Sequence, residues 1–255
     1  MPDTLYQPIL IRFDGAHYAP ALRVPKDADP LAIVRHFGLL VPRPSIFLSG
    51  GASAMSQEDM DRVRVLIEDG IAAFAERHHI TVIDGGTEAG IMRMMGRVHA
   101  QRGYKFPLIG VAPYGKVTYP GHPNPKGEAA LDEGHTHFVL VEADEWGSES
   151  HLLGGLVRAI SQKQQPRLGI LINGGAIAER DVYMATTQGE DRVPVLVVDG
   201  TGRKADEISN AYSTGSTDNA IIRAIVKGGK IHVTHLKDGL DKFLARMSST
   251  LGLRA

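Results

Sequence analysis

Short apolar runs alternate with amphipathic segments along most of the chain. The apolar runs have the length of buried strands, and the segments between them carry apolar residues at helical spacing. Such an alternation forms right-handed βαβ crossovers, which build a parallel sheet with helices on both faces. The predicted strands are 45–49, 80–84, 108–112, 136–141, 168–172 and 193–198, and the predicted helices are 57–78, 87–102, 146–164, 176–187 and 204–212. The pattern therefore predicts an α/β fold, a doubly wound and mainly parallel sheet.

The two ends of the chain add smaller elements. Residues 5–25 alternate weakly around Asp14-Gly15, a sequence typical of a hairpin turn. Asp29 and Pro30 fit the N-cap and first turn of a short helix. We place a domain boundary at residue 44, between an N-terminal β-hairpin/helix extension (1–44) and the main domain (45–255). The tail predicts a helix at 217–226, a strand at 230–234 and a last helix at 239–251.

Composition excludes several classes of partner. The 255 residues carry a net charge of -1, and Lys and Arg are scattered, so we expect neither nucleic acid nor an anionic membrane as a partner. Cysteine is absent, which removes disulfides and thiolate metal sites. No apolar run approaches the roughly 20 residues that span a bilayer, and the expected location is the cytoplasm.

Glycine-rich turns follow most of the predicted strands. In a parallel sheet the segments after the strands face the ligand crevice, and a strand that turns into a helix on glycines presents backbone N–H groups to an anion. One Gly-Gly pair is usually only a turn, but five such ends favour a phosphate-bearing ligand. The candidate ligand-binding residues at these ends are Gly50, Gly51, Ser53, Gly85, Gly86, Thr87, Gly90, Tyr114, Gly115, Gly174, Gly200, Thr201, Gly202 and Arg203. Neither Walker spacing nor Gly-x-Gly-x-x-Gly follows the first strand, which argues against an ordinary kinase or NAD dehydrogenase.

The segment after the fourth predicted strand carries Trp146, Gly147, Ser148 and Glu149. Trp146 is the only tryptophan, and it fits either stacking on a base or simple packing. Gly147 permits close backbone approach, and Ser148 fits a helix cap or a phosphate contact. Glu149 fits three roles: an acceptor for ribose hydroxyls, a catalytic group at a glycosidic bond, or an acidic residue favoured at a helix start.

Two further features are ambiguous. Residues 116–133 are too long for a simple connector and too polar for core, so they fit either a functional lid or a surface loop. His135 and His137 alternate on a predicted strand, which suits a metal, but no acidic partner has clear ligand spacing. We therefore expect a hydrogen-bonding role for these histidines and no metal site.

Several motifs, taken together, resemble one family. They are Asp84-Gly-Gly-Thr-Glu-Ala-Gly-Ile-Met92, Ile109-Gly-Val-Ala-Pro-Tyr-Gly115, the run from Leu131 to Val141, Gly147-Ser-Glu149, and the run from Val193 to Asp206. In this order they are similar to the SLOG superfamily of Rossmann-like domains. Within it they resemble the LSDAT branch, shared with the cytosolic N-terminal region of melastatin-type TRP channels (TRPM). More distantly, the chain resembles lysine-decarboxylase-like phosphoribohydrolases.

The resemblance implies a binding protein or sensor for a nucleotide-derived ligand of the adenine class, such as ADP-ribose or an NAD-related molecule. It requires no cofactor, and members of the superfamily commonly self-associate, so we expect a homo-oligomer. The alternative is a phosphoribohydrolase that cleaves the N-glycosidic bond of a nucleotide, with Glu149, Glu142 or Glu145 assisting departure of the base. The hydrolases have Pro-Gly-Gly-x before a paired-glutamate helix start, whereas residues 143–146 here are Ala-Asp-Glu-Trp and Ser150-His151 stand at the paired positions. Binding is therefore favoured over hydrolysis.

Overall fold

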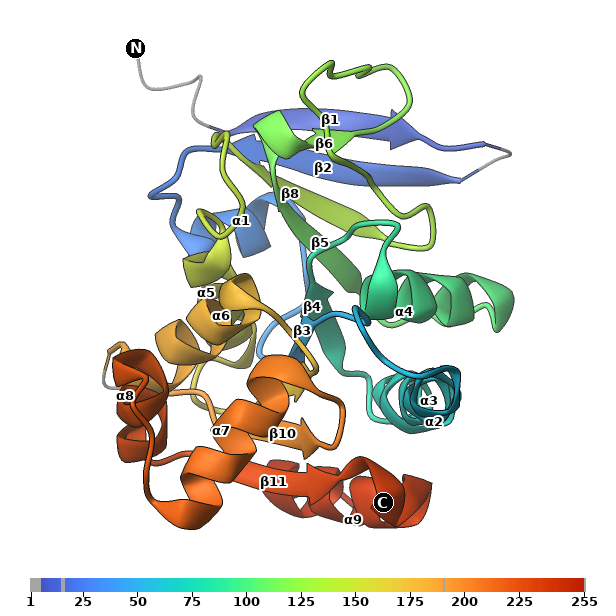
Figure 1. Ribbon diagram of the computed structural model, residues 1–255. Helices are drawn as coiled ribbons and strands as arrows, with labels where there is room; N and C mark the ends of the chain where they lie inside the picture. Colours follow the sequence, from blue (N-terminus) through green and yellow to red (C-terminus); the bar gives the residue numbers. More distant parts are fainter. Residues whose placement is uncertain (1–5, 15–16, 190, 255) are drawn as a thin grey trace.

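The computed structural model describes residues 6–14, 17–189 and 191–254. In this part of the chain, nine strands form one sheet in the order β1-β2-β8-β5-β4-β3-β9-β10-β11 (Figure 1). All neighbouring strands are parallel except the hairpin pair β1 and β2. The strands are β1 (Gln7–Arg12), β2 (Tyr18–Val24), β3 (Ser45–Gly50), β4 (Thr81–Asp84), β5 (Leu108–Pro113), β8 (His137–Val141), β9 (Arg167–Ile172), β10 (Val195–Asp199) and β11 (Ile231–His235). The predicted α/β class is confirmed.

Helices cover both faces of this sheet (Figure 1). Successive residues of a strand point to opposite faces, so Val82 and Ile83 of β4 belong to different core clusters. One face packs against α1 (Pro30–His36), α5 (Ser150–Ser161), α6 (Ala176–Thr187), α7 (Arg203–Thr214) and α8 (Ala220–Gly228). The other packs against α2 (Gln57–Val65), the π-helical η1 (Leu66–Ala72), α3 (Ala73–Arg77), α4 (Gly90–Gln101) and α9 (Gly239–Leu251). This two-sided burial explains the nearly continuous apolar character of the central strands.

Some element boundaries differ from the sequence prediction. Helix α4 begins at Gly90, three residues late, because Thr87 forms an isolated bridge with Leu131 before the helix starts. Helix α5 begins at Ser150, four residues late, after a turn. The predicted helix 57–78 continues through the π-helical stretch η1.

The N-terminal hairpin extends the main sheet. Strand β2 pairs in parallel with β8, with Ala21 opposite Phe138, and α1 packs against α5. The division at residue 44 stays a prediction about domain organisation, although the hairpin and the main domain share one sheet. Gly15, the second residue of the predicted turn, lies outside the described residues.

The sheet order reverses beside β3. From β3 the chain builds outward through β4, β5 and β8, and it then returns to the other side of β3 with β9 and β10. In open α/β sheets, ligands bind outside the carboxyl ends of the strands at such a switch point. The ends of β3 and β9 are therefore the expected place for a ligand site.

Candidate functional site

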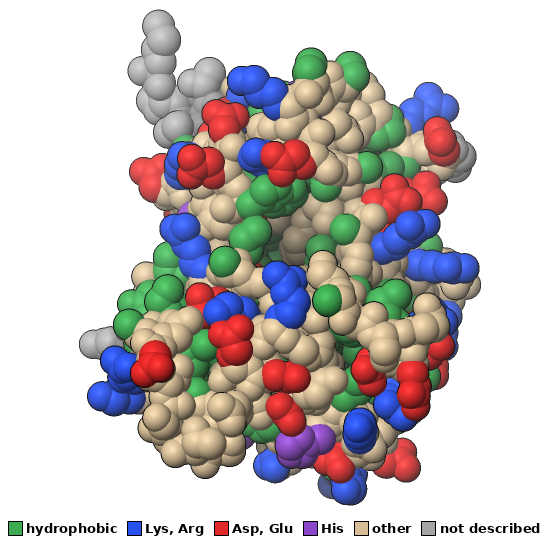
Figure 2. All heavy atoms as spheres, in the orientation of Figure 1, with side chains coloured by type: hydrophobic (Ala, Val, Ile, Leu, Met, Phe, Trp, Pro, Cys, Tyr) green, Lys and Arg blue, Asp and Glu red, His purple; other side chains and the backbone are tan. Residues whose placement is uncertain are grey.

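A cavity of about 360 Å³ opens at the carboxyl ends of β3, β4 and β9. This volume lies within the roughly 300–1,000 Å³ of small-molecule sites. The apolar part of its wall comes from several elements and includes Leu48, Met92, Val111, Leu153 and Ile177. Figure 2 shows the corresponding hollow near the centre of one face, bordered by hydrophobic side chains and by Lys or Arg side chains. We call this space the switch-point cavity.

One end of the switch-point cavity suits an anion. Gly175, Ala176 and Ile177, at the start of α6, line the wall, and α6 has no side-chain cap. The first N–H groups of such a helix have no intrahelical acceptor, and the helix dipole favours negative charge there. Arg203, exposed and without a hydrogen-bond or ion-pair partner among the described residues, lies beside them. A Cβ added at Gly175 would be 2.8 Å from Arg203 Nη2.

Two buried carboxyl groups, Glu149 and Asp181, also line the cavity. Burial raises the pKa of Glu149 to about 7, and the nearby Asp181 charge adds to this rise. Burial likewise raises the pKa of Asp181 to about 6, although the Ser49 and Ser150 hydroxyls oppose the rise. The Ser49 hydroxyl donates to Asp181 Oδ2 over 2.6 Å, which fixes that carboxyl group. The cavity therefore contains two acids that titrate close to neutral pH.

The structure brings only part of the predicted site together. The predicted residues that line the switch-point cavity are Gly50, Gly85, Thr87, Trp146, Glu149 and Arg203. The predicted residues outside its wall are Gly51, Ser53, Gly86, Gly90, Tyr114, Gly115, Gly147, Ser148, Gly174, Gly200, Thr201 and Gly202.

Internal hydrogen bonds account for much of this difference. The Gly86 N–H donates to Asp84 Oδ1, and the Gly174 N–H donates to Asn173 Oδ1. The N–H groups of Gly200 and Gly202 both donate to Asp206 Oδ1. These glycines shape turns, and their N–H groups are already satisfied within the chain.

Thr201 and Gly51 are likewise committed to the fold. The Thr201 hydroxyl donates to the Val198 carbonyl and accepts from the Asn173 N–H, and the Gly51 N–H donates to the Ile172 carbonyl. Among the groups described above, the start of α6 and Arg203 remain available to an anion.

Tyr114 and Gly115 lie in a separate hollow of about 400 Å³. There the Arg23 guanidinium lies 3.9 Å from the Tyr114 ring centroid and pairs with Glu142 over 2.5 Å. Glu142 and Glu145 are exposed and outside the switch-point cavity, so Glu149 is the only one of the three proposed catalytic glutamates that lines it.

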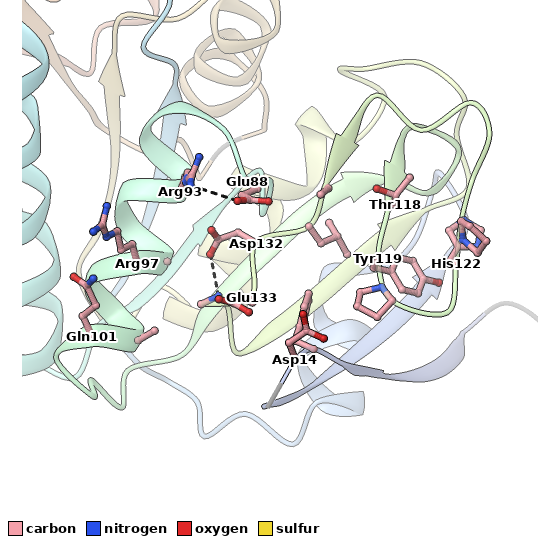
Figure 3. A pocket seen from close by; sticks show the side chains of 18 residues that line it. Asp14, Glu88, Arg93, Arg97, Gln101, Thr118, Tyr119, His122, Asp132 and Glu133 are labelled. Atoms are coloured by element: carbon pink, nitrogen blue, oxygen red, sulfur yellow. Dashed lines mark hydrogen bonds and ion pairs between the residues drawn. The ribbon is translucent and has the colours of Figure 1, made fainter. Parts of the chain in front are cut away.

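A larger hollow, of about 640 Å³, lies between α4 and residues 118–134 (Figure 3). Arg93, Arg97 and Gln101 line one wall, and Tyr119 and His122 line another. It lies along the side of α4 and away from the switch point, and its charged residues are exposed except Asp132, which is already paired with His135. We therefore favour the smaller cavity as the functional site.

The 116–133 segment is connected to the rim of the switch-point cavity. It contains the short parallel pair β6 (Val117–Thr118) and β7 (Ala129–Ala130). Glu128 pairs with Lys116 and accepts a 2.7 Å hydrogen bond from Trp146 Nε1. Trp146 is thus held in place at the cavity wall from outside, whereas movement of the segment as a lid stays a prediction.

His135 occupies a buried ionic cluster below the Gly85-Gly86 turn. Its Nε2 lies 2.8 Å from Asp84 Oδ1 and its Nδ1 lies 3.1 Å from Asp132 Oδ1. Burial alone would lower the pKa of His135, but the two carboxylates outweigh it and raise the pKa to about 9. The expected hydrogen-bonding role of His135 is confirmed, and both ring nitrogens are occupied by it. No group of three or more His, Asp and Glu side chains within the described ranges is arranged to hold a metal ion.

Asp181 and Ser49 were missed by sequence reasoning. Asp181 lies on the buried face of α6, between Ala178 and Ala185. An acidic residue on the apolar face of a predicted helix was the available signal, because an unpaired buried carboxyl group is unfavourable and usually has a function.

Comparison with known proteins agrees with this architecture. Residues 43–245 match the family described as SLOG in TRPM, prokaryote. This chain belongs to that family. The chain is 26% identical over 262 residues to transient receptor potential cation channel subfamily M member-like 2 of Nematostella vectensis, a match that covers 87% of this chain and 16% of the relative.

Other relatives are similar in the same way. A transient receptor potential channel of Caenorhabditis elegans is 29% identical over 248 residues, covering 83% of this chain and 12% of the relative. Transient receptor potential cation channel subfamily M member 7 of Homo sapiens is 26% identical over 233 residues, covering 77% of this chain and 12% of the relative. The SLOG domain thus corresponds to a small part of these channels. Among the residues that the structure describes, no helix combines the length and the apolar character needed to cross a bilayer.

Proposed function

We propose that this SLOG domain is a sensor that binds a nucleotide-derived ligand of the adenine class, such as ADP-ribose or an NAD-related molecule, in the switch-point cavity. One observation carries the proposal: Arg203 and the uncapped start of α6 share a cavity with an apolar wall and Trp146. The first two suit a phosphate, and the apolar wall with an indole suits a base. The family relationship supports a ligand-sensing role.

The proposal extends to the setting of the domain. A cytoplasmic location and a homo-oligomeric state follow from the resemblance to cytosolic sensing regions, and light scattering coupled to size-exclusion chromatography tests the second. A monomer at micromolar concentration would contradict it.

Thermal-shift titration with ADP-ribose, NAD and AMP tests the binding function. A ligand at 100 times its Kd stabilises the folded state by about 2.7 kcal/mol. For a chain of this length, 1 kcal/mol shifts Tm by about 2–4 °C, so the expected rise is about 5–11 °C. The absence of a shift with every purine nucleotide would refute the proposal.

Two arginine variants distinguish the hollows. Arg203→Gln removes a charged donor from the switch-point cavity, and we expect about tenfold to hundredfold weaker binding, because hydrogen bonds to charged groups contribute about 1.5–3 kcal/mol. Arg97→Gln is the matched control, since Arg97 is exposed and lines the hollow beside α4. Weaker binding in Arg97→Gln alone would place the ligand in the other hollow.

The buried acids support a second candidate function, hydrolysis of the N-glycosidic bond of a nucleotide. In this reaction the oxygen of water bonds to C1′, the C1′–N bond breaks, the base leaves with a proton from an acid, and the proton released by the water restores that acid. Glu149, with its pKa raised by burial to about 7, is placed to supply that proton. Chromatography for free base during long incubation with a nucleotide panel tests this activity, and an unchanged rate in Glu149→Gln would exclude the role of Glu149.

A further inference from the structure

Buried polar groups at and beside the wall of the switch-point cavity lack hydrogen-bond partners. Glu149, Asp181 and Ser150 are 5%, 6% and 1% exposed. Glu149 Oε2 and Asp181 Oδ1, from two residues that line the cavity, have no hydrogen-bond partner among the described residues. Ser150 Oγ also lacks a partner at hydrogen-bond geometry, but Ser150 lies outside the cavity wall, and its hydroxyl lowers the pKa of the neighbouring Asp181. A buried polar atom without a partner is unfavourable, and most such atoms in folded proteins are satisfied. The two free carboxyl oxygens are therefore acceptors that a ligand in the cavity would satisfy.

These groups are held in place by the fold. Glu149 precedes the first residue of α5, and Asp181 lies in the second turn of α6, which packs against α5. The hydrogen bond from the Ser49 hydroxyl occupies Asp181 Oδ2 and leaves Oδ1 without a partner. The two carboxyl groups thus line one cavity from neighbouring helices.

The anion end lies on the same helix. Gly175 and Asp181 are six residues apart along α6, which at 1.5 Å per residue is about 9 Å. A ribose 5′-phosphate has a comparable length, with an anion at one end and two adjacent hydroxyls at the other. Each hydroxyl donates one hydrogen bond, which suits the two free carboxyl oxygens.

We infer that Glu149 and Asp181 bind the vicinal hydroxyls of a ribose whose 5′-phosphate lies between Arg203 and the start of α6. The inference rests on the proposed binding function and adds to it the orientation of the ligand. It assigns Asp181 as a residue that determines specificity for ribose over deoxyribose. The base then lies toward Trp146 and the apolar wall.

Calorimetric titration with matched nucleotides tests the inference. AMP is compared with 2′-deoxy-AMP and 2′,3′-dideoxy-AMP, and ADP-ribose is compared with 2′-deoxy-ADP-ribose. A site built to bind a hydroxyl discriminates strongly against the analogue that lacks it. We expect each missing hydroxyl to weaken binding by about tenfold or more, because the partner atom is left unsatisfied.

The same titrations in Asp181→Asn and Glu149→Gln reveal which residues carry the preference. We expect the ribose preference to fall below about threefold in each variant. Asp218→Asn is the control, since Asp218 is exposed and outside the cavity, and it should retain the full preference. Circular dichroism and Tm measurements establish that each variant is folded, and the comparison of ligands in the unmodified chain does not depend on any variant.

Two outcomes would overturn the inference, and they differ in what else they affect. Equal affinity for AMP and its two deoxy analogues, together with weaker binding in Arg203→Gln, would refute the ribose assignment and leave the proposed function standing. A chain that binds none of AMP, ADP-ribose and NAD would refute both.

Discussion

Replacing His135 with Asn is expected to destabilise the fold strongly. The side chain joins Asp84, at the end of β4, to Asp132, and these three residues are almost entirely buried. Removing the imidazolium leaves two carboxylates in the interior without their counter-charge. Breaking a buried ion pair in this way costs about 3–5 kcal/mol. At about 2–4 °C per kcal/mol, the expected fall in Tm is about 6–20 °C.

The pH dependence of stability isolates the charge of His135 from its packing. Its pKa is about 9 in the folded protein and about 6.5 in an unfolded chain. The ion pairs therefore contribute fully below pH 6.5, and their contribution falls as the pH rises toward 9. The pKa difference corresponds to about 3 kcal/mol in total. Urea denaturation between pH 6 and 9 measures this loss, and in His135→Asn it should be absent.

Glu149, with a pKa of about 7, adds a smaller slope near pH 7, so the two proteins are compared at each pH. His36→Asn is the control, because His36 is exposed at the end of α1. A His135→Asn protein with the same decline above pH 7 as the unmodified chain would refute the buried imidazolium.

Three further perturbations follow from the packing and charges. Gly86→Ala is expected to lower the free energy of unfolding by more than about 3 kcal/mol, because Gly86 has φ +65° and its added Cβ would lie 2.6 Å from Gly110 Cα. The added Cβ of Gly121→Ala meets no atom within 4 Å. This variant should therefore lose only the roughly 1–2 kcal/mol that a left-handed backbone costs a residue other than glycine. Urea denaturation separates the two, and equal losses would contradict the packing argument. Glu149→Gln is expected to stabilise the ligand-free protein by about 3 kcal/mol at pH 8 and to have no effect at pH 4, because the raised pKa makes ionisation destabilising only above the unfolded value. No gain at pH 8 would count against that burial. Glu128→Gln weakens the acceptor for Trp146 Nε1, so the fluorescence of this only tryptophan should shift to longer wavelength, and an unchanged spectrum would argue against the contact.

The sequence was sufficient to predict the parallel sheet. The apolar runs at 45–49, 108–112 and 168–172 are nearly continuous, as expected of strands buried on both faces, and each became a central strand with bounds within one residue of the prediction. Helix starts were predicted less well, because they depend on tertiary contacts such as the bridge between Thr87 and Leu131. These contacts leave no periodic signal in the local sequence.

The sequence pointed to the edge of the sheet where the switch-point cavity opens, but to only part of the cavity wall. Glycines at strand ends mark this edge, yet their spacing does not reveal where each N–H is directed. The acceptors for Gly86, Gly200 and Gly202 are the side chains of Asp84 and Asp206, which lie nearby in the chain but equally fit a ligand-binding pattern. Asp181 was missed for the opposite reason, since it enters the cavity from the second turn of a helix.

The turn glycines and the residues that remain available to a ligand have different roles in this chain. Turn glycines such as Gly86 and Gly202 determine the shape of the strand ends, and their loss would perturb the fold before it changed the ligand. The groups that remain available to a ligand are the start of α6, Arg203 and the two buried acids. If the proposed subsites are right, a chain with the same glycine turns but with an apolar residue in place of Asp181 would keep the cavity and the proposed anion end and lose the proposed hydroxyl-binding end. Ligand preference among such domains should therefore be assigned from positions 149, 181 and 203, in the numbering of this chain, and not from the glycine motifs that identify the family.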